Sequence, residues 1–325
     1  MEIEKLKNLK KVLEDKKIND DFEIFFKDIN SEKISLNSFR KIDENSKDFE
    51  TFFIDGGNNI IFDETDLINF LVYVGFTKYK NIEFQYGHIF RFDITLELIE
   101  SKEDKLLYKT HVDELDEIKI KQKLEKLDVE KIKNELIHSI PKTVECSDLD
   151  DNSKFSRIRK MLELKLSKIL NEFSLVILDG SLDSNNDEEK KLIASIKNII
   201  ALSKKSKLIT NSGIGFERFF NQVKFPTPWF VKIGKKDDFE IYALKFTNLK
   251  NYVFRLDSKI ENVEEVLSFL YKHSKDGLAF GYPFGLVFID HLARVSNEDA
   301  QYYRNLIEIQ YELSEDLHDE FNSTY

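Results

Sequence analysis

The chain has 325 residues, of which 41% are hydrophobic and 34% are charged, so we expect a soluble globular protein with one large α/β domain or two smaller ones. Its formal net charge of −11 argues against a general nucleic-acid coat protein, and its single cysteine, Cys146, excludes an internal disulfide and a cysteine-based zinc cluster. No run reaches the ~18 apolar residues of a membrane span, and the charged start at residues 1–5 lacks the apolar core of a signal peptide, so a cytoplasmic location is expected.

The first segment predicts a helix over residues 1–28, because Leu6, Leu9 and Leu13 recur at helical spacing among charged residues. A polar stretch at residues 41–49 follows. Residues 1–48 are therefore interpreted as an N-terminal helical arm that either packs on the rest of the protein or serves a partner.

The next segment predicts a meander of β-strands at residues 52–54, 67–76 and 89–98, where apolar residues alternate or form short buried runs. Strands joined by short connections are normally antiparallel neighbours.

Residues 101–150 are highly charged, but leucine and isoleucine recur regularly as far as Ile140. We therefore expect a charged helical insertion, which Pro141 ends. An acidic, polar linker is expected over residues 142–153.

The second half of the chain alternates predicted helices and strands. A helix at residues 154–172 carries the apolar stripe Ile158, Leu162, Leu166 and Ile169, and a strand at residues 175–179 follows it. The remaining predicted elements are a helix capped by Asn186 or Asp187 and running to about residue 202, strands at residues 229–233, 239–247 and 252–257, a helix at 262–274, and helices over about 286–316. This order predicts an α/β fold over residues 49–325, in which helices flank one mixed sheet.

An apolar run that stops on Asp-Gly occurs twice, at Asp55-Gly56 and at Asp179-Gly180. A carboxylate at the tip of a strand can point into a cleft where the sheet opens to a ligand. Two acids that meet there repel each other, and a divalent cation such as Mg²⁺ or Mn²⁺ relieves that repulsion. The alternative for Asp55 is a hairpin turn, and for Asp179 it is a helix cap or a turn.

Glu163 is the third acid of this candidate site, because it borders the apolar stripe of the helix that leads into the second Asp-Gly strand. The alternative is a rim glutamate that pairs with Arg159 one helical turn earlier. Two metal ions about 4 Å apart can activate a water and stabilise the leaving oxygen of a phosphodiester. The glycines after each aspartate would let a phosphate backbone approach without a Cβ clash.

Three local basic stretches are candidates for contact with nucleic acid, although solvated surface is the default interpretation of each. They are Arg157, Arg159 and Lys160; Lys204, Lys205 and Lys207; and Lys232, Lys235 and Lys236. Lys204 is placed just after a helix, where it either contacts a phosphate or only interacts with the helix dipole.

Four blocks, in order and at their spacing, resemble the NurA nucleases, which act with the hexameric DNA translocase HerA. They are the strand with Asp55-Gly56, the Arg-rich helix with Glu163, the strand end at residues 178–182 with Ser203-Lys204 downstream, and the segment from Tyr282-Pro283 to Ala293-Arg294. Together they span about residues 50–296.

The resemblance implies an RNase H-like fold and a homodimeric Mn²⁺- or Mg²⁺-dependent deoxyribonuclease that docks on a HerA-like ATPase. It implies metal ligation by Asp55, Glu163 and Asp179, and a site tyrosine at Tyr282. Asp290 falls where many members have a catalytic histidine, and His291 is one place later, so either can fill that position. Gly57 stands where a serine is frequent. DNA repair and defence against foreign DNA remain equally open as settings.

Two other functions stay open. An actin- or sugar-kinase-like phosphotransferase would need glycine-rich phosphate loops, for which residues 213–215 are the only modest candidate, and the chain lacks a P-loop. A non-catalytic adaptor of the translocase is the third possibility, since position 290 departs from the family pattern.

Aromatic side chains can stack unpaired bases, and Trp229 and Phe230 are candidates, although core packing is their default interpretation. His88, His111 and His273 stand alone in the sequence and are expected to be surface or structural residues.

Overall fold

The computed structural model describes residues 25–44, 49–102, 105–120, 127–147, 153–248, 252–275 and 281–322. The chain divides into two compact units, and β3 (Glu50–Asp63) begins in the first and continues in the second. The first unit comprises the chain up to Phe53, the hairpin tip Tyr79–Phe84, and Leu170–Val287. The second comprises Ile54–Lys78, Gln85–Ile169 and the chain from Phe288 onward. No described helix is both long and apolar enough to cross a membrane.

The first unit contains a mixed sheet with the strand order β1-β11-β12-β13-β10-β9. The pair β9 and β10 is parallel, and the other pairs in this order are antiparallel. These strands are β1 (Asn30–Ser31), β9 (Leu175–Asp179), β10 (Ile199–Ser203), β11 (Trp229–Lys236), β12 (Phe239–Lys245) and β13 (Phe254–Ser258), and β2 (Arg40–Lys41) also pairs with β11.

Among the described residues, the helices that lie wholly in this unit are the 3₁₀ helix η1 (Leu36–Ser38), α4 (Asp187–Ser195), α5 (Phe216–Gln222) and α6 (Val263–His273). The predicted capping residue Asn186 is confirmed, since its side chain accepts the backbone N–H of Glu189 at 2.8 Å. The prediction that this helix continues to residue 202 is wrong, because α4 ends at Ser195 and residues 199–203 form β10. The helix α4 therefore connects two parallel strands, as in other βαβ units.

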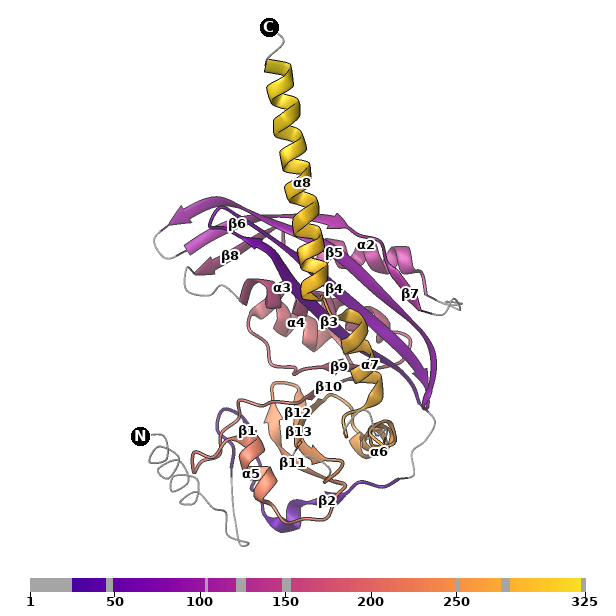
Figure 1. The fold of residues 1–325 in the computed structure, drawn as a ribbon. Helices are drawn as coiled ribbons and strands as arrows, with labels where there is room; N and C mark the ends of the chain where they lie inside the picture. The colour runs from indigo at the N-terminus through magenta and orange to yellow at the C-terminus, as the bar shows by residue number, and fades with distance from the viewer. Residues whose placement is uncertain are drawn as a thin grey trace, which may run out of the picture. The chain divides into compact units, whose positions relative to one another are not determined.

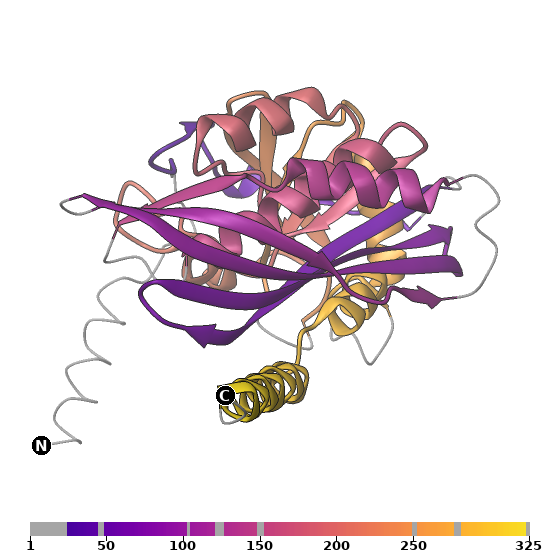
Figure 2. The ribbon, with the colours of Figure 1, turned by 90° about the horizontal axis from the view of Figure 1, so that it is seen from above.

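The second unit contains long strands in the order β3-β4-β5-β6-β8, and β7 pairs with β5. Figure 2 shows these strands, drawn in indigo to magenta, as a curved sheet. The strands are β4 (Leu67–Lys80), β5 (Glu83–Lys102), β6 (Lys105–Glu114), β7 (Ile118–Ile120) and β8 (Thr143–Ser147).

Two helices lie on one side of this sheet. They are α2 (Val129–Ser139) and α3 (Ser153–Leu170). The ring of Phe155 in α3 packs on Phe70 of β4, with 4.6 Å between their centroids, and Lys165 of α3 pairs with Glu135 of α2 at 3.1 Å. The core of the second unit therefore lies between α3 and the sheet.

The other face of the sheet carries the C-terminal helices α7 (Phe284–Ala293) and α8 (Asn297–Asn322), of which α8 is drawn in yellow in Figure 1. The side-chain amide of Asn59 donates to the carbonyl of Ser296 at 3.2 Å, and Arg304 Nε donates to the carbonyl of Ile61 at 2.7 Å. Because side chains alternate along a strand, the odd-numbered residues of this part of β3 face these helices.

The prediction of a helical insertion at residues 101–150 is wrong for most of its described residues. Only Val129–Ser139 is helical there, whereas β6, β7 and β8 are strands. The linker predicted from residue 142 is likewise wrong over Thr143–Ser147, which pairs with β6. The helix predicted at residues 1–28 lies almost wholly outside the described residues.

Candidate functional site

Asp55 lies inside β3, so the strand-end position predicted for it is wrong, and so is the alternative of a hairpin turn. The strand runs on for eight further residues to Asp63. Asp55 is only 6% exposed, and its Oδ1 accepts the backbone N–H of Gly56 at 2.8 Å. The carboxylate is therefore held against the backbone of the next residue of its own strand.

Gly56 and Gly57 allow helices to approach the two faces of β3. A Cβ at Gly56 would lie 2.8 Å from Glu163 Oε1 and 3.1 Å from Arg159 Cγ, both in α3. A Cβ at Gly57 would lie 2.3 Å from the carbonyl oxygen of Ala293, at the end of α7. The protein's own helices fill these spaces, so the expectation that both glycines admit a phosphate backbone is wrong.

Glu163 is buried on the α3 side of this strand, with 4% of the residue exposed. Arg159 Nη1 lies 3.5 Å from Glu163 Oε1 and donates to the carbonyl of Gly56 at 2.8 Å, so the predicted pair with Arg159 is present. Asp55 and Gly57 share the opposite face, by the alternation of side chains. Asp55 and Glu163 therefore approach Gly56 from opposite faces of β3.

Asp179 is the last residue of β9, as predicted, and lies opposite Leu202 of the parallel strand β10. Lys204 Nζ lies 3.5 Å from Asp179 Oδ2 and 4.2 Å from the centre of the Tyr282 ring. Lys204 follows a strand, so its predicted place after a helix is wrong and the helix-dipole alternative does not apply. Its ammonium group is held by a carboxylate and an aromatic face at the carboxyl edge of the sheet.

The carbonyl of Leu202 joins two parts of this edge. It accepts the backbone N–H of Gly180 and the hydroxyl of Tyr282, each at 3.0 Å. Tyr282 is 3% exposed, and its ring packs on Phe254 with 5.2 Å between centroids. Gly180 has φ +118°, and a Cβ there would meet nothing within 4 Å, so the open approach expected of the glycines exists at this position.

Asp290 and His291 lie in the second unit, on α7. Asp290 Oδ2 pairs with Arg294 Nη2 at 3.1 Å, with both side chains substantially exposed. Among the residues that the structure describes, no group of three or more Asp, Glu, His or Cys side chains gathers as a metal site. Asp179 belongs to one unit and Asp55 and Glu163 to the other, so their convergence stays a prediction.

Three of the remaining sequence candidates have local structural roles. Lys232 pairs with Glu240 at 2.7 Å, and Lys236 pairs with Asp183 at 2.6 Å. Trp229 is 1% exposed, so the default prediction of core packing is confirmed for it.

Two of the three amides in the glycine-rich segment at residues 213–215 are already bound within the loop. The N–H groups of Gly213 and Ile214 are bound by the carbonyl and the hydroxyl of Thr210, each at 2.9 Å. The kinase alternative therefore gains no support from this loop.

The histidines serve local structure, as expected. Burial lowers the pKa of His88, whose Nε2 lies 3.0 Å from Glu117 Oε2. Burial also lowers the pKa of His273, whose Nε2 lies 2.8 Å from the carbonyl of Asn81. His111 pairs with Glu97 at 2.8 Å on the surface.

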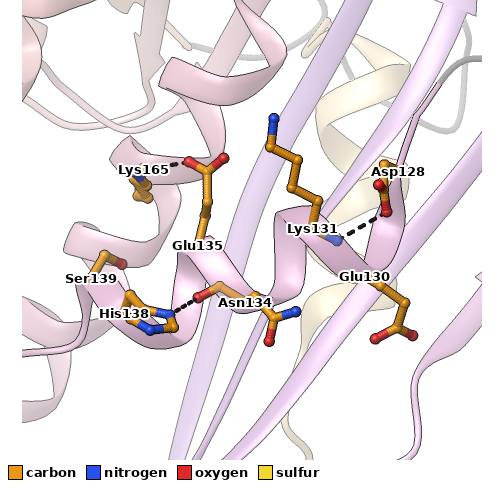
Figure 3. A pocket seen from close by; sticks show the side chains of 8 residues that line it. All are labelled: Asp128, Glu130, Lys131, Asn134, Glu135, His138, Ser139 and Lys165. Carbon is orange, nitrogen blue, oxygen red and sulfur yellow. Dashed lines mark hydrogen bonds and ion pairs between the residues drawn. The ribbon is translucent and has the colours of Figure 1, made fainter.

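An open groove of about 560 Å³ lies along α2 (Figure 3), and none of the predicted site residues lines it. Its side chains mostly bind within or beside the helix, as His138 Nδ1 does to the carbonyl of Asn134 at 2.6 Å. It is lined by Asp128, Glu130, Lys131, Asn134, Glu135, His138, Ser139 and Lys165. We interpret it as a solvated helix surface.

The sequence analysis missed a buried charged cluster in the first unit. Arg255 and Asp257 are 3% and 0% exposed within β13, and both contact the segment that follows Asp179. Their signal in the sequence was two charges that alternate with Phe254 and Leu256 in an otherwise apolar strand.

No family model and no curated protein matches this sequence. The structure is similar to the crystal structure of the NurA nuclease from Sulfolobus solfataricus, with 15% sequence identity and a TM-score of 0.48 over 86% of this chain and 89% of that chain.

Proposed function

We propose that this protein is a metal-dependent deoxyribonuclease. The observation that carries the proposal is that two buried acids, Asp55 and Glu163, both reach Gly56 in the middle of β3. Buried carboxylates require compensating positive charge, which Arg159 supplies in part. Oxygen donors of this kind suit Mg²⁺ or Mn²⁺.

The ligands proposed for the metal are Asp55, Glu163 and Asp179, with Asp290 as a further candidate. Two ions held by these residues would supply the Lewis acidity for activating a water and for stabilising the leaving oxygen of the phosphodiester. Lys204 is proposed to contact the phosphate, because its ammonium group is already held at the carboxyl edge by Asp179 and Tyr282. The open side of Gly180 would leave room for a sugar-phosphate backbone beside it.

The proposed substrate is DNA, cleaved from its ends, internally, or both, with DNA end processing or antiphage defence as the setting. The resemblance of the four sequence blocks supports a homodimer that works in the cytoplasm with a HerA-like hexameric translocase. The net charge of −11 fits such a division of labour, because the translocase would supply most of the grip on DNA.

The direct test is degradation of linear DNA by the purified chain, alone and with a HerA-like ATPase. We expect activity with Mn²⁺, its loss with EDTA, and its loss in Asp55→Ala and Asp179→Ala variants that still melt cooperatively. Glu264→Ala is the matched control. The side chain of this exposed acid forms an ion pair with the exposed Arg40 at 2.9 Å. Full activity in both aspartate variants would exclude the proposed metal site.

Asp290→Ala and His291→Ala distinguish the two candidates for the last catalytic position. Each change should leave the melting temperature almost unaltered, because the exposed Asp290–Arg294 pair contributes only about 0.3–0.5 kcal/mol and His291 is exposed. We expect DNA degradation to fall in one variant and persist in the other. Persistence in both would remove α7 from the catalytic machinery.

A further inference from the structure

The segment that follows the proposed ligand Asp179 is fixed at several points. We call residues 179–183 the Asp179 loop. Gly180 N–H donates to the carbonyl of Leu202 at 3.0 Å, and Leu182 N–H donates to Asp257 Oδ2 at 2.9 Å. Asp183 accepts hydrogen bonds from Arg255 Nη1 and Lys236 Nζ, both at 2.6 Å.

Arg255 and Asp257 form the buried half of this anchor. Arg255 Nε donates to Asp257 Oδ1 at 2.7 Å, and Nη2 donates to Asp257 Oδ2 at 3.0 Å, which is a two-point contact. The remaining Nη1 reaches Asp183. One guanidinium therefore connects the interior of β13 to the end of the Asp179 loop.

Fold stability alone does not explain this ion pair. A buried ion pair is often no more stabilising than apolar side chains of similar volume, because both charges lose their hydration. Arg255 lies opposite Ala243 of β12, a buried apolar residue on the same face of the sheet, so an apolar residue would suit this position. Unlike an apolar side chain, the pair forms directional hydrogen bonds with the Asp179 loop: Asp257 accepts the N–H of Leu182, and Arg255 donates to the carboxylate of Asp183.

We propose that Arg255, oriented by Asp257, is a positioning residue that holds the Asp179 loop so that Asp179 faces a bound metal ion. The inference rests on the proposed nuclease function, since it concerns the same carboxylate. Arg255 is too deeply buried to contact DNA itself, with 3% of the residue exposed. Its effect must therefore pass through the loop.

The test compares Arg255→Met with Arg40→Met, an arginine of the same unit whose ion pair with Glu264 is exposed. We expect Arg255→Met to speed hydrogen exchange at the amides of Gly180 and Leu182. We also expect it to raise the Mn²⁺ concentration for half-maximal DNA degradation by about tenfold, the lower end for residues that orient metal ligands, with KM for DNA unchanged. Arg40→Met should change none of these.

A second variant, Asp183→Asn, covers the case in which Arg255→Met does not fold. It keeps the Arg255–Asp257 pair and weakens only the outer contacts, so it should shift exchange and Mn²⁺ requirement in the same direction by less. Unchanged exchange, or faster exchange with an unchanged Mn²⁺ requirement, would overturn the inference. An unaltered chain that never degrades DNA with Mn²⁺ would instead overturn the proposed function, while the exchange data would still test the loop anchor.

Discussion

Replacing Gly57 by alanine tests whether this glycine serves helix packing. The new Cβ would lie 2.3 Å from the carbonyl oxygen of Ala293 and 3.1 Å from the backbone nitrogen of Val295. Both are backbone atoms, so relief requires a shift of the α7 end or of β3. Overpacking of this kind typically costs about 1–3 kcal/mol, and we expect the upper end, about 3 kcal/mol. At roughly 2–4 °C per kcal/mol, the melting temperature should fall by about 6–12 °C.

Gly215→Ala is the matched control for thermal unfolding followed by circular dichroism. Gly215 has φ −68°, a value open to alanine, and a Cβ there would meet nothing within 4 Å. We expect this control to melt close to the unaltered chain. If Gly57→Ala melts with the control, the packing argument is refuted. If it then loses activity while remaining stable, the glycine serves ligand approach after all.

Two further predictions concern charge and exposure in the first unit. Burial raises the pKa of Asp183, but hydrogen bonds from Arg255 and Lys236 outweigh it and lower this pKa from 3.8 to about 2. The ionised Asp183 therefore contributes about 2 kcal/mol to the free energy of unfolding above pH ~4, and this contribution is lost as the pH falls toward 2. We expect the difference in unfolding free energy between the unaltered chain and Asp183→Asn, measured with urea, to shrink below pH ~4. A difference that is independent of pH would contradict this assignment. The single tryptophan, Trp229, is buried, with 5.0 Å between its ring centroid and that of Phe39. Its fluorescence should therefore peak at short wavelength and resist quenching by acrylamide. Quenching by added DNA would instead place the ring at the surface.

Most strands were predictable because their apolar residues alternate or form short runs. The exceptions include β6, β7 and β8, which lie in the charged segment. In β6 the buried Leu106 and Tyr108 lie between exposed lysines at 105 and 109, and the density of charge suggested a helix surface. Similarly, β10 is a short run that is buried almost throughout, and such a run cannot be distinguished from the continuation of a helix by periodicity alone. Strand pairing with distant segments decides both cases, and it is invisible in the local pattern.

The candidate site was predictable in its residue types and less so in its geometry. Burial of Asp55 and Glu163 agrees with their position beside apolar runs. The error at Asp55 arose because Asp-Gly is typical of a turn, whereas here Gly56 and Gly57 accommodate helices on two faces of a continuous strand. Both uses exploit the missing side chain, so the sequence alone does not separate them.

The doubly bonded carbonyl of Leu202 limits the coordination chemistry available at the carboxyl edge of β9 and β10. A backbone oxygen has two lone pairs, and here the Gly180 amide and the Tyr282 hydroxyl take both. This oxygen is therefore not available as a ligand for the metal ion proposed beside Asp179. At the proposed metal site, carboxylates and water would then supply the inner-sphere ligands, which fits Mg²⁺, an ion that dehydrates reluctantly and usually keeps several waters.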